Sequence, residues 1–364
     1  MNEKDVILSI EDLSVRFNLR GRVLHAIRGL SVKVHKGESL AIVGESGCGK
    51  SVLNKNLIGL LDNNGFIDGG VIKYYGLEKD NEIAGLFEED ENGTYANLAR
   101  FKKEKEWLKI RGKEICMILQ DPMTSLNPLK TIGAQIAEAI QLHQGLKGKE
   151  LKEAVLQIMR DVRIDNPERR YKQYPHEFSG GMRQRVMIAM ALACEPDILI
   201  ADEPTTALDV TIQAQILDLI RDLQAQLGMS VILITHDLGV VAEMCDEVIV
   251  MYAGEVCERG TADEIFYNPK HEYTKGLLRS IPTVSDDDRR LEPIGGTPVD
   301  LLNMPDGCPF SSRCDNAMKI CLGYKAKEMK INDNHIASCW HNIKDAIAAG
   351  ELTEKEVEEM YNNE

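Results

Sequence analysis

A glycine-rich loop in the first part of the chain has the spacing that binds the phosphates of a nucleotide. Residues 44–51 read G-E-S-G-C-G-K-S and fit the pattern G-x-x-x-x-G-K-[ST]. The loop follows an apolar run at 39–43 and precedes a helical pattern from Val52 to Leu61, so it is expected between a strand and a helix. Its backbone N–H groups suit the β- and γ-phosphates, while Lys50 supplies a positive charge and Ser51 a ligand for Mg²⁺.

Two carboxylates follow a second apolar run. Residues 197–203 read D-I-L-I-A-D-E, which predicts a buried strand ending in Asp202 and Glu203. Asp202 would hold the same Mg²⁺, and Glu203 would stand where a base takes a proton from an attacking water. A third run, 231–235, ends in His236. The alternative is a pair of solvated carboxylates at a strand end.

A short segment between these features reads S-G-G-M-R at 179–183. Ser179 is a good helix N-cap, and the glycines open a predicted helix that runs to about Ala193, so the first N–H groups of that helix are unpaired and suit an anion. Taken together, the loop, the acidic strand end, His236 and this segment resemble the ATP-binding cassette of an ABC transporter. The resemblance implies an α/β fold: a P-loop NTPase cassette with a RecA-like core, an N-terminal antiparallel β region and a helical subdomain.

The resemblance also implies roles for individual residues. Gln120, after the apolar run 115–119, is similar to the glutamine that senses the metal and the γ-phosphate, and His236 to the switch histidine. Segment 179–183 is similar to the family signature, with Met182 in place of the usual glutamine, and it would dock on the nucleotide of an opposing cassette. The residues of this trans site are Ser179, Gly180, Gly181, Met182 and Arg183, and those of the D-loop are Ala207, Leu208 and Asp209.

The expected ligands are ATP and Mg²⁺. The resemblance implies that Phe17, at the end of the first predicted strand, stacks on adenine, with ordinary core packing as the alternative. Catalysis is assigned to Glu203, His236 and Gln120, and Mg²⁺ binding to Ser51, Gln120 and Asp202. The expected ATP contacts are Phe17, Gly44, Ser46, Gly47, Cys48, Gly49, Lys50, Ser51 and Val52.

Flanking phrases narrow the resemblance to importers of dipeptides and oligopeptides, and within them to the D-type ATP-binding subunit. These phrases are D-P-M-T-S-L-N-P at 121–128, Y-P-H-E at 174–177 and T-T-A-L-D-V-T-I-Q-A-Q at 205–215. The resemblance implies an F-type partner subunit, two permeases, an extracytoplasmic solute-binding protein and a peripheral place on the cytoplasmic face of the membrane. The alternatives are import of another solute, such as nickel, a non-transport ABC ATPase, and a redox-sensing or metal-handling protein whose function lies in the tail, with the cassette only as a regulator.

Composition agrees with a globular ATPase. The 364 residues are 43% hydrophobic and 28% charged, which is enough for a real core, and no run approaches the ~20 apolar residues of a membrane span. The formal net charge of -15 argues against a nucleic-acid partner, because phosphate contacts need clustered Lys and Arg.

The predicted organisation is a cassette at 1–268 with its helical subdomain at about 123–178, an extension at 269–345 and a helical tail at 346–364. Strands are expected at 7–17 and 24–34, and helices at 132–140 and 151–162. The stretch between Gly76 and Arg111 carries acidic and then basic runs and is longer than the family pattern, which favours a solvated surface insertion.

Four of the nine cysteines lie close together in the extension, with the spacing C-x5-C-x6-C-x17-C. Disulfides are improbable in a cytosolic protein, so clustered thiols indicate a metal or iron–sulfur site, and the tight C-x2-C pairs of zinc knuckles are absent from the sequence. The resemblance implies a four-iron four-sulfur cluster, with zinc and free thiols as alternatives. The ligands would be Cys308, Cys314, Cys321 and Cys339.

Overall fold

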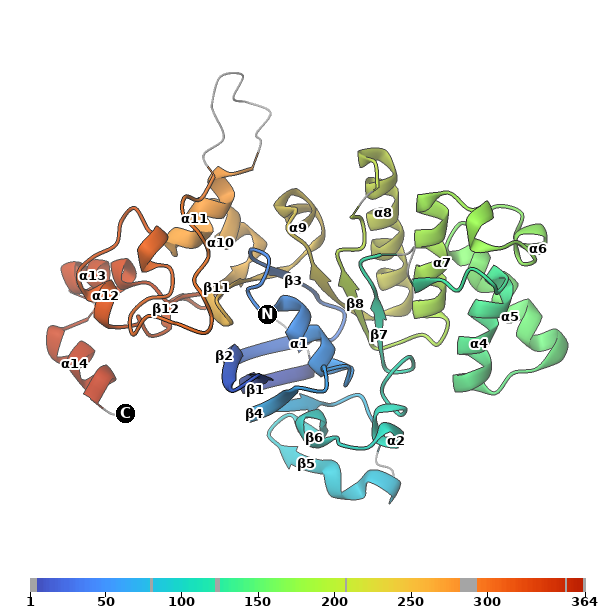
Figure 1. Cartoon of the computed structure of the whole chain (residues 1–364), viewed down its shortest axis with the longest axis horizontal. Coiled ribbons are helices and arrows are strands. Elements are labelled where there is room, and N and C mark those ends of the chain that lie inside the picture. Colours follow the sequence, from blue (N-terminus) through green and yellow to red (C-terminus); the bar gives the residue numbers. More distant parts are fainter. Residues whose placement is uncertain are drawn as a thin grey trace.

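Two β-sheets organise the chain, with helices at both ends of the larger one (Figure 1). The structure is a computed structural model that describes residues 5–78, 81–121, 125–206, 208–281, 293–350 and 352–362. The strands are β1 (Val6–Leu19), β2 (Arg22–His35), β3 (Ser39–Val43), β4 (Gly65–Tyr74), β5 (Phe87–Asp90), β6 (Gly93–Asn97), β7 (Ile115–Ile118), β8 (Ile198–Asp202), β9 (Ser230–Ile234), β10 (Glu247–Tyr252), β11 (Glu255–Thr261), β12 (Met329–Asn332) and β13 (His335–Ala337).

The helices gather mainly in two groups, one at each end of the molecule (Figure 1). They are α1 (Lys50–Leu57), α2 (Glu104–Trp107), α4 (Ile132–Gln144), α5 (Gly148–Asp161), α6 (Pro167–Arg170), α7 (Gly180–Leu192), α8 (Val210–Leu227), α9 (Leu238–Met244), α10 (Ala262–Tyr267), α11 (Glu272–Arg279), α12 (Ile320–Gly323), α13 (Trp340–Ala349) and α14 (Glu354–Asn362). Short 3₁₀ turns lie at Asn81–Leu86, Leu98–Arg100, Pro175–Glu177 and Ser311–Arg313.

The larger sheet has the order β12-β13-β11-β10-β3-β9-β8-β7, and its strands from β10 to β7 are parallel. Both faces of these parallel strands are covered. In β8, Leu199 and Ala201 join one hydrophobic core, whereas Ile198 and Ile200 join the other. Burial on both faces explains why the strands appear in the sequence as continuous apolar runs rather than alternating ones.

The smaller sheet is antiparallel and has the order β2-β1-β4-β6-β5. The expected strands at 7–17 and 24–34 are confirmed as β1 and β2. The stretch between Gly76 and Arg111 is not merely a solvated insertion, because β5 and β6 extend this sheet and side chains of the stretch enter its core. The buried ones include Ile83, Tyr95, Leu98, Phe101, Trp107 and Ile110.

The predicted helices of the α-helical region are confirmed as α4, α5 and α7, which pack on one another at one end of the larger sheet (Figure 1). The helix after the glycine-rich loop is shorter than expected, since α1 begins at Lys50 and ends at Leu57 rather than Leu61. Ile58 leaves the helical conformation there with φ −117°.

The C-terminal part of the chain adds strands to the larger sheet. β13 pairs with β11 in antiparallel register, Glu258 opposite Ala337 and Gly260 opposite His335, and β12 pairs with β13. Helices α12, α13 and α14 lie at the same end of the molecule as this hairpin, opposite to α4–α7 (Figure 1). A small third core holds Cys321, Trp340 and Ile343, and the rings of Trp340 and Tyr361 stack at 5.1 Å.

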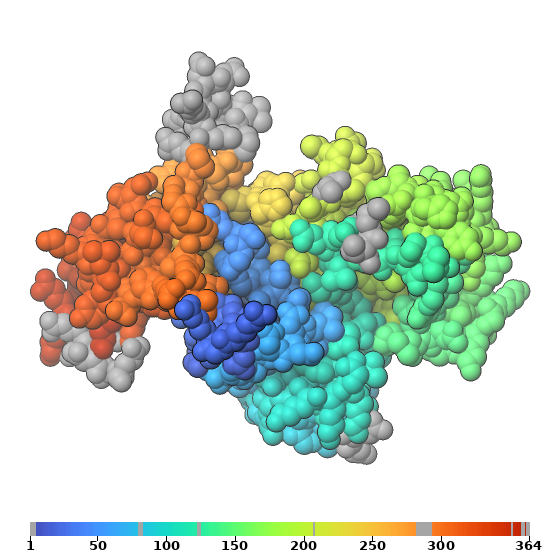
Figure 2. Space-filling view, in the orientation of Figure 1, coloured from blue at the N-terminus to red at the C-terminus, as the bar shows by residue number. Residues whose placement is uncertain are grey.

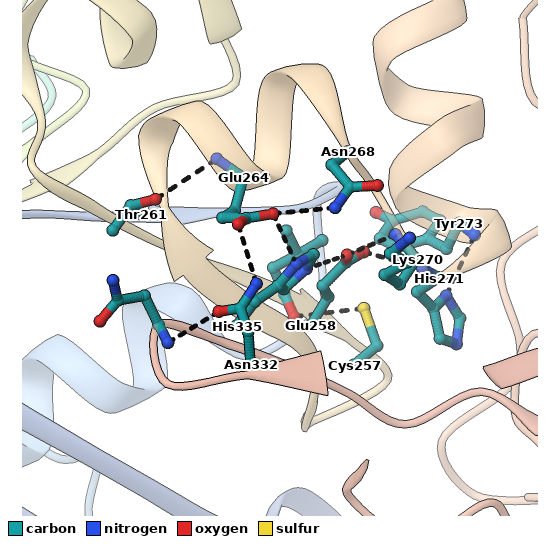
Figure 3. Close-up of polar contacts among 12 residues, drawn as sticks. Cys257, Glu258, Thr261, Glu264, Asn268, Lys270, His271, Tyr273, Asn332 and His335 are labelled. Carbon is teal, nitrogen blue, oxygen red and sulfur yellow. Dashed lines mark hydrogen bonds and ion pairs between the residues drawn. The ribbon is translucent and has the colours of Figure 1, made fainter. Parts of the chain in front are cut away.

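A buried polar joint fixes this added hairpin to the cassette (Figure 3). The fully buried carboxylate of Glu258 on β11 accepts hydrogen bonds from the backbone N–H groups of Lys270 and His271, at 2.6 and 2.9 Å. His335 on β13 places Nε2 2.7 Å from Glu258 and Nδ1 3.2 Å from Glu264. The imidazole ring of His335 therefore joins β13 to two carboxylates of the β11–α10 segment, which lies more than 70 residues earlier in the chain.

These contacts favour the ionised form of the Glu258 carboxyl group. Burial alone would raise the pKa of this carboxyl, but the hydrogen bonds from His335 and from the two backbone N–H groups outweigh burial and lower it. A lowered pKa in the folded state means that the joint stabilises the fold at neutral pH and weakens when Glu258 is protonated.

We predict that Glu258→Gln lowers the free energy of unfolding by about 1.5 to 3 kcal/mol, the scale of a hydrogen bond to a charged group, because the neutral amide is a weaker acceptor for the buried donors around it. The contribution of Glu258 is complete above its ordinary pKa of 4.5 and is lost as the pH falls below that value, because its pKa in the folded protein is lower. Denaturant unfolding between pH 3 and 7, about the range over which carboxyls titrate, would measure both effects. Glu243→Gln, at an exposed position, is the control, and a variant with the stability curve of the wild type would contradict the prediction.

Candidate nucleotide-binding site

A cavity of about 530 Å³ opens at the carboxyl ends of β3, β8 and β9. This edge is where ligands bind in parallel α/β sheets, because the loops after neighbouring strands diverge there. The described residues that line it are Phe17, Leu19, Leu24, Ala26, Gly44, Glu45, Ser46, Gly47, Gly49, Lys50, Ser51, Val52, Gln120, Asp202, Glu203, Ile234, His236 and Leu301.

The glycine-rich loop needs glycine at two positions for separate reasons. Gly44 has φ +150°, and a Cβ there would lie 2.3 Å from the carbonyl oxygen of Met251. Gly49 has φ +111° at the N-cap of α1, and its Cβ would lie 3.0 Å from the carbonyl oxygen of Ala26. Both residues let the loop turn tightly against the sheet and leave its N–H groups at the cavity.

The side chain of Lys50 extends back across the glycine-rich loop. Its Nζ donates to the carbonyl oxygens of Gly44 at 2.5 Å and Glu45 at 3.1 Å, and the side chain is nearly buried. Its ammonium group therefore lies at the centre of the loop, where phosphate oxygens would be attracted to it.

Asp202 stands beside this positive charge at the end of β8. Burial and then the neighbouring charge of Glu203 raise the pKa of its carboxyl, and Lys50 opposes them. A cation placed between Asp202 and Ser51 would relieve this repulsion. The pair therefore fits Mg²⁺, which binds through one or two protein oxygens together with phosphate oxygens.

The three residues predicted to act in catalysis meet at the carboxylate of Glu203. Gln120 donates from Nε2 to Oε2 at 2.7 Å, and Thr206 donates from its hydroxyl to the same oxygen at 2.9 Å. His236 places Nδ1 3.2 Å from Oε1. Glu203 has φ +47°, a strained value for a residue with a side chain, and its N–H donates to the Ile234 carbonyl at 2.8 Å.

The register of the strands in the larger sheet explains why Gln120, Glu203 and His236 lie close together. Ile118 pairs with Ala201, so two residues further along Gln120 comes beside Glu203, and Asp202 pairs with Ile234, two residues before His236. Oε1 of Glu203 has one hydrogen-bond partner among the residues that the structure describes, so it retains a lone pair for a water molecule.

Phe17 lies at the apolar end of the cavity with Leu19, Leu24 and Ala26. Only 7% of Phe17 is exposed and it also belongs to a hydrophobic core, which supports the packing interpretation. Stacking on adenine stays a prediction, with which its place in the cavity is consistent. Cys48 does not line the cavity, although an ATP contact was expected of it. Its side chain is buried, and burial raises the pKa of the thiol.

The signature segment lies outside the cavity of its own chain, since none of its described residues lines the cavity. Ser179 caps α7 by accepting from the N–H of Met182 at 3.4 Å, and a Cβ on Gly181 would lie 2.5 Å from Ile212 of α8. Asp209 of the D-loop caps α8, and Leu208 packs on the core, whereas Ala207 lies outside the described residues. This arrangement fits a site that acts on another chain.

Two contacts that sequence reasoning missed join the C-terminal part to the glycine-rich loop. Arg313 pairs with Glu45 through both carboxylate oxygens, at 2.5 and 2.9 Å. The hydroxyl of Tyr273 accepts from the Glu45 N–H at 2.8 Å. No local sequence pattern signals them, because the partners are more than 220 residues apart.

The four cysteines of the extension line one small cavity of about 20 Å³. Burial, with a smaller contribution from the neighbouring thiols, raises the pKa of Cys308 and of Cys314 to about 11. Backbone N–H groups two residues on oppose this shift at three of them, from Phe310 to Cys308, Asn316 to Cys314 and His341 to Cys339. Among the described residues, no three His, Cys, Asp or Glu side chains form a group suited to a single metal ion.

Comparison with known proteins gives two family matches. A family described as "ABC transporter" matches residues 27–206, and one described as "Oligopeptide/dipeptide transporter, C-terminal region" matches residues 257–321. The chain is 50% identical to the dipeptide transport ATP-binding protein DppD of Bacillus subtilis, over 92% of this chain and 94% of that one. It is 49% identical to the oligopeptide transport ATP-binding protein AmiE of Streptococcus pneumoniae, over 94% and 92%.

A solved structure of the dimeric ATP-binding cassette MJ0796, bound to ADP and Pi, superimposes with a TM-score of 0.57 at 25% identity, covering 70% of this chain and 98% of that one. Fold, site and relatives agree. The protein belongs to the ABC ATPases, as an ATP-binding subunit of the oligopeptide/dipeptide importer family. This membership confirms the expected class and sets aside the non-transport alternative. In the described part of the chain, no helix combines the length and the apolar character needed to span a bilayer.

We predict that Phe17→Leu weakens ATP and ADP alike by about 1 to 3 kcal/mol, the scale of aromatic–base stacking. Leucine keeps most of the packing volume, which matters because truncation of this buried ring to alanine would itself cost about 3–5 kcal/mol of stability. Affinities would be measured by isothermal calorimetry. Phe66→Leu, on the paired strand β4 and outside the cavity, is the control. Equal affinities for Phe17→Leu and wild type would leave Phe17 with packing alone.

Proposed function

We propose that the chain hydrolyses ATP in this cavity to drive peptide uptake, with Glu203 as the general base. The observation that carries the proposal is the convergence of Gln120, Thr206 and His236 on the Glu203 carboxylate at the cavity wall. Three donors fix the carboxylate, and one oxygen keeps room for a water. A base that takes a proton from a positioned water suits in-line attack on a γ-phosphate.

The remaining residues supply charge and position. Lys50 and the N–H groups of the loop would hold the phosphates, and Ser51, Asp202 and Gln120 would hold Mg²⁺, which neutralises the developing charge when it is bound. His236 would hydrogen-bond the γ-phosphate through the ring edge that does not face Glu203.

The complete site needs a second cassette. The signature, Ser179 to Arg183, lies outside its own cavity, and the related cassette MJ0796 is dimeric. We therefore propose that this signature segment contacts the nucleotide bound by an F-type partner subunit. The two cassettes would lie against two permeases on the cytoplasmic face of the membrane. Relatives named for dipeptide and oligopeptide transport support a peptide as the solute, delivered by a solute-binding protein.

For the four cysteines of the extension we propose a four-iron four-sulfur cluster rather than one zinc ion. All four line one cavity, yet no three of them form a group suited to a single ion. A cluster gives each thiolate an iron of its own and so tolerates wider spacing. The N–H groups aimed at three of the sulfurs stabilise thiolates, which are the ligands such clusters require. We propose a structural role for the cluster, ordering segments that contribute few apolar side chains.

Glu203→Gln should lower ATP hydrolysis by about 10² to 10⁴ while ATP binding persists, because the amide keeps the shape but cannot take the proton. The assay is phosphate release by the complex assembled with its partner ATPase and permeases. Glu243→Gln, the same change at an exposed position, should leave the rate unaltered. Near-normal turnover by Glu203→Gln in that complex would refute the assigned base.

Protein purified without oxygen should contain about four irons per chain, which follows from four thiolate ligands to one cluster. Cys308→Ser or Cys339→Ser should lose the iron and destabilise the extension, whereas ATP should still bind. Cys194→Ser, outside the cysteine cavity, is the matched control. Stoichiometric zinc would select a zinc site, and metal-free protein with four alkylated thiols would overturn both.

A further inference from the structure

The C-terminal extension contributes one residue to the wall of the nucleotide cavity. Among the described residues that line the cavity, Leu301 alone comes from the chain beyond His236. It belongs to residues 293–304, a segment without regular secondary structure that we call the strap. Figure 2 shows the extension lying directly against the N-terminal β region on one face of the molecule.

Polar contacts hold Leu301 in place. Arg28 of β2 donates from Nη2 to the Leu301 carbonyl oxygen at 3.3 Å. Asp300 closes a turn around Leu301, because its side chain accepts from the Leu302 N–H at 2.9 Å and its carbonyl from the Asn303 N–H at 3.0 Å. Hydrophobic side chains on either side, Val299 and Met304, pack against the larger core. The strap is thus anchored both before and after the residue that reaches the cavity.

Arg313 joins the strap to the phosphate-binding loop. Its Nε donates to the Gly295 carbonyl at 2.9 Å, and its two terminal nitrogens pair with the Glu45 carboxylate. Only 3% of this side chain is exposed, and its guanidinium lies 5.9 Å from the ring centres of Tyr252 and Phe310. A bidentate pair of this kind, in which the guanidinium is buried, holds its partners in one geometry.

Leu301 shares the cavity with Phe17, Leu24 and Ala26, whose side chains are apolar, whereas Lys50 and Ser51 form its charged part. A nucleotide has the same division, with a flat base at one end and phosphates at the other. We propose that Leu301 packs against the adenine ring bound by Phe17, so that the extension completes the base-binding end of the site. This proposal rests on the nucleotide site described above.

The test compares ligands with and without a base. The full-length chain would be titrated with Mg²⁺ and ATP, ADP or inorganic tripolyphosphate. Leu301→Ala should weaken ATP and ADP by roughly 5- to 30-fold, as expected for losing one or two kcal/mol of apolar contact. Leu301→Ala should bind tripolyphosphate with the same affinity as the wild type. This result would also show that the glycine-rich loop of the variant is folded. Leu302→Ala, next to Leu301 but outside the cavity, is the matched control.

Each of the other possible results of these titrations would contradict one specific claim. If Leu301→Ala binds nucleotides like the wild type while Phe17→Leu and Lys50→Ala weaken them, the strap has no part in binding and the nucleotide site stands. If Phe17→Leu and Lys50→Ala leave binding unchanged, the site itself is wrongly placed. An equal loss of tripolyphosphate affinity in Leu301→Ala would assign the effect to the loop rather than to the base, and would overturn the proposed contact.

Discussion

Parallel pairing of β3, β9 and β8 is the constraint on which the site depends. These strands pair in fixed register, so the residues that follow them reach the same edge of the sheet at the same level. Strand pairing is what brings the glycine-rich loop close to Glu203 and His236. In the sequence, 150 residues or more lie between the loop and Glu203. A slip of one residue in β8 would turn Asp202 and Glu203 to the wrong faces, because side chains alternate along a strand.

The extension is connected to this site by charge as well as by packing. Arg313 reaches Glu45 from a turn that lies between Cys308 and Cys314, so the glycine-rich loop and the segment that carries the cysteines share one partly buried ion pair. Removing one partner of such a pair costs far more than the pair contributes, because a charge is then left buried. The extension is therefore a structural part of the cassette rather than an appendage.

Much of the cassette could be predicted because its chemistry is local. The loop, the acidic strand end and the capped helix at Ser179 each lie within a few residues of a strand or helix signal. The insertion between Gly76 and Arg111 was misjudged because its charges are conspicuous, whereas the buried Tyr95 and Trp107 are spaced irregularly between them. Leu301 and Arg313 could not be found at all, since their partners lie more than 260 residues away and spacing carries no sign of them.

The pairing of β13 with β11 has a consequence for how the chain is made. β11 ends at Thr261, but its outer edge gains a partner only when residues 335–337 are present. A ribosome adds about 5–20 residues per second, so a nearly complete cassette waits several seconds with an unpaired strand edge. That edge is a template for strands of other nascent copies, and closing it requires almost the whole chain. Truncated products would therefore aggregate rather than accumulate as defective subunits.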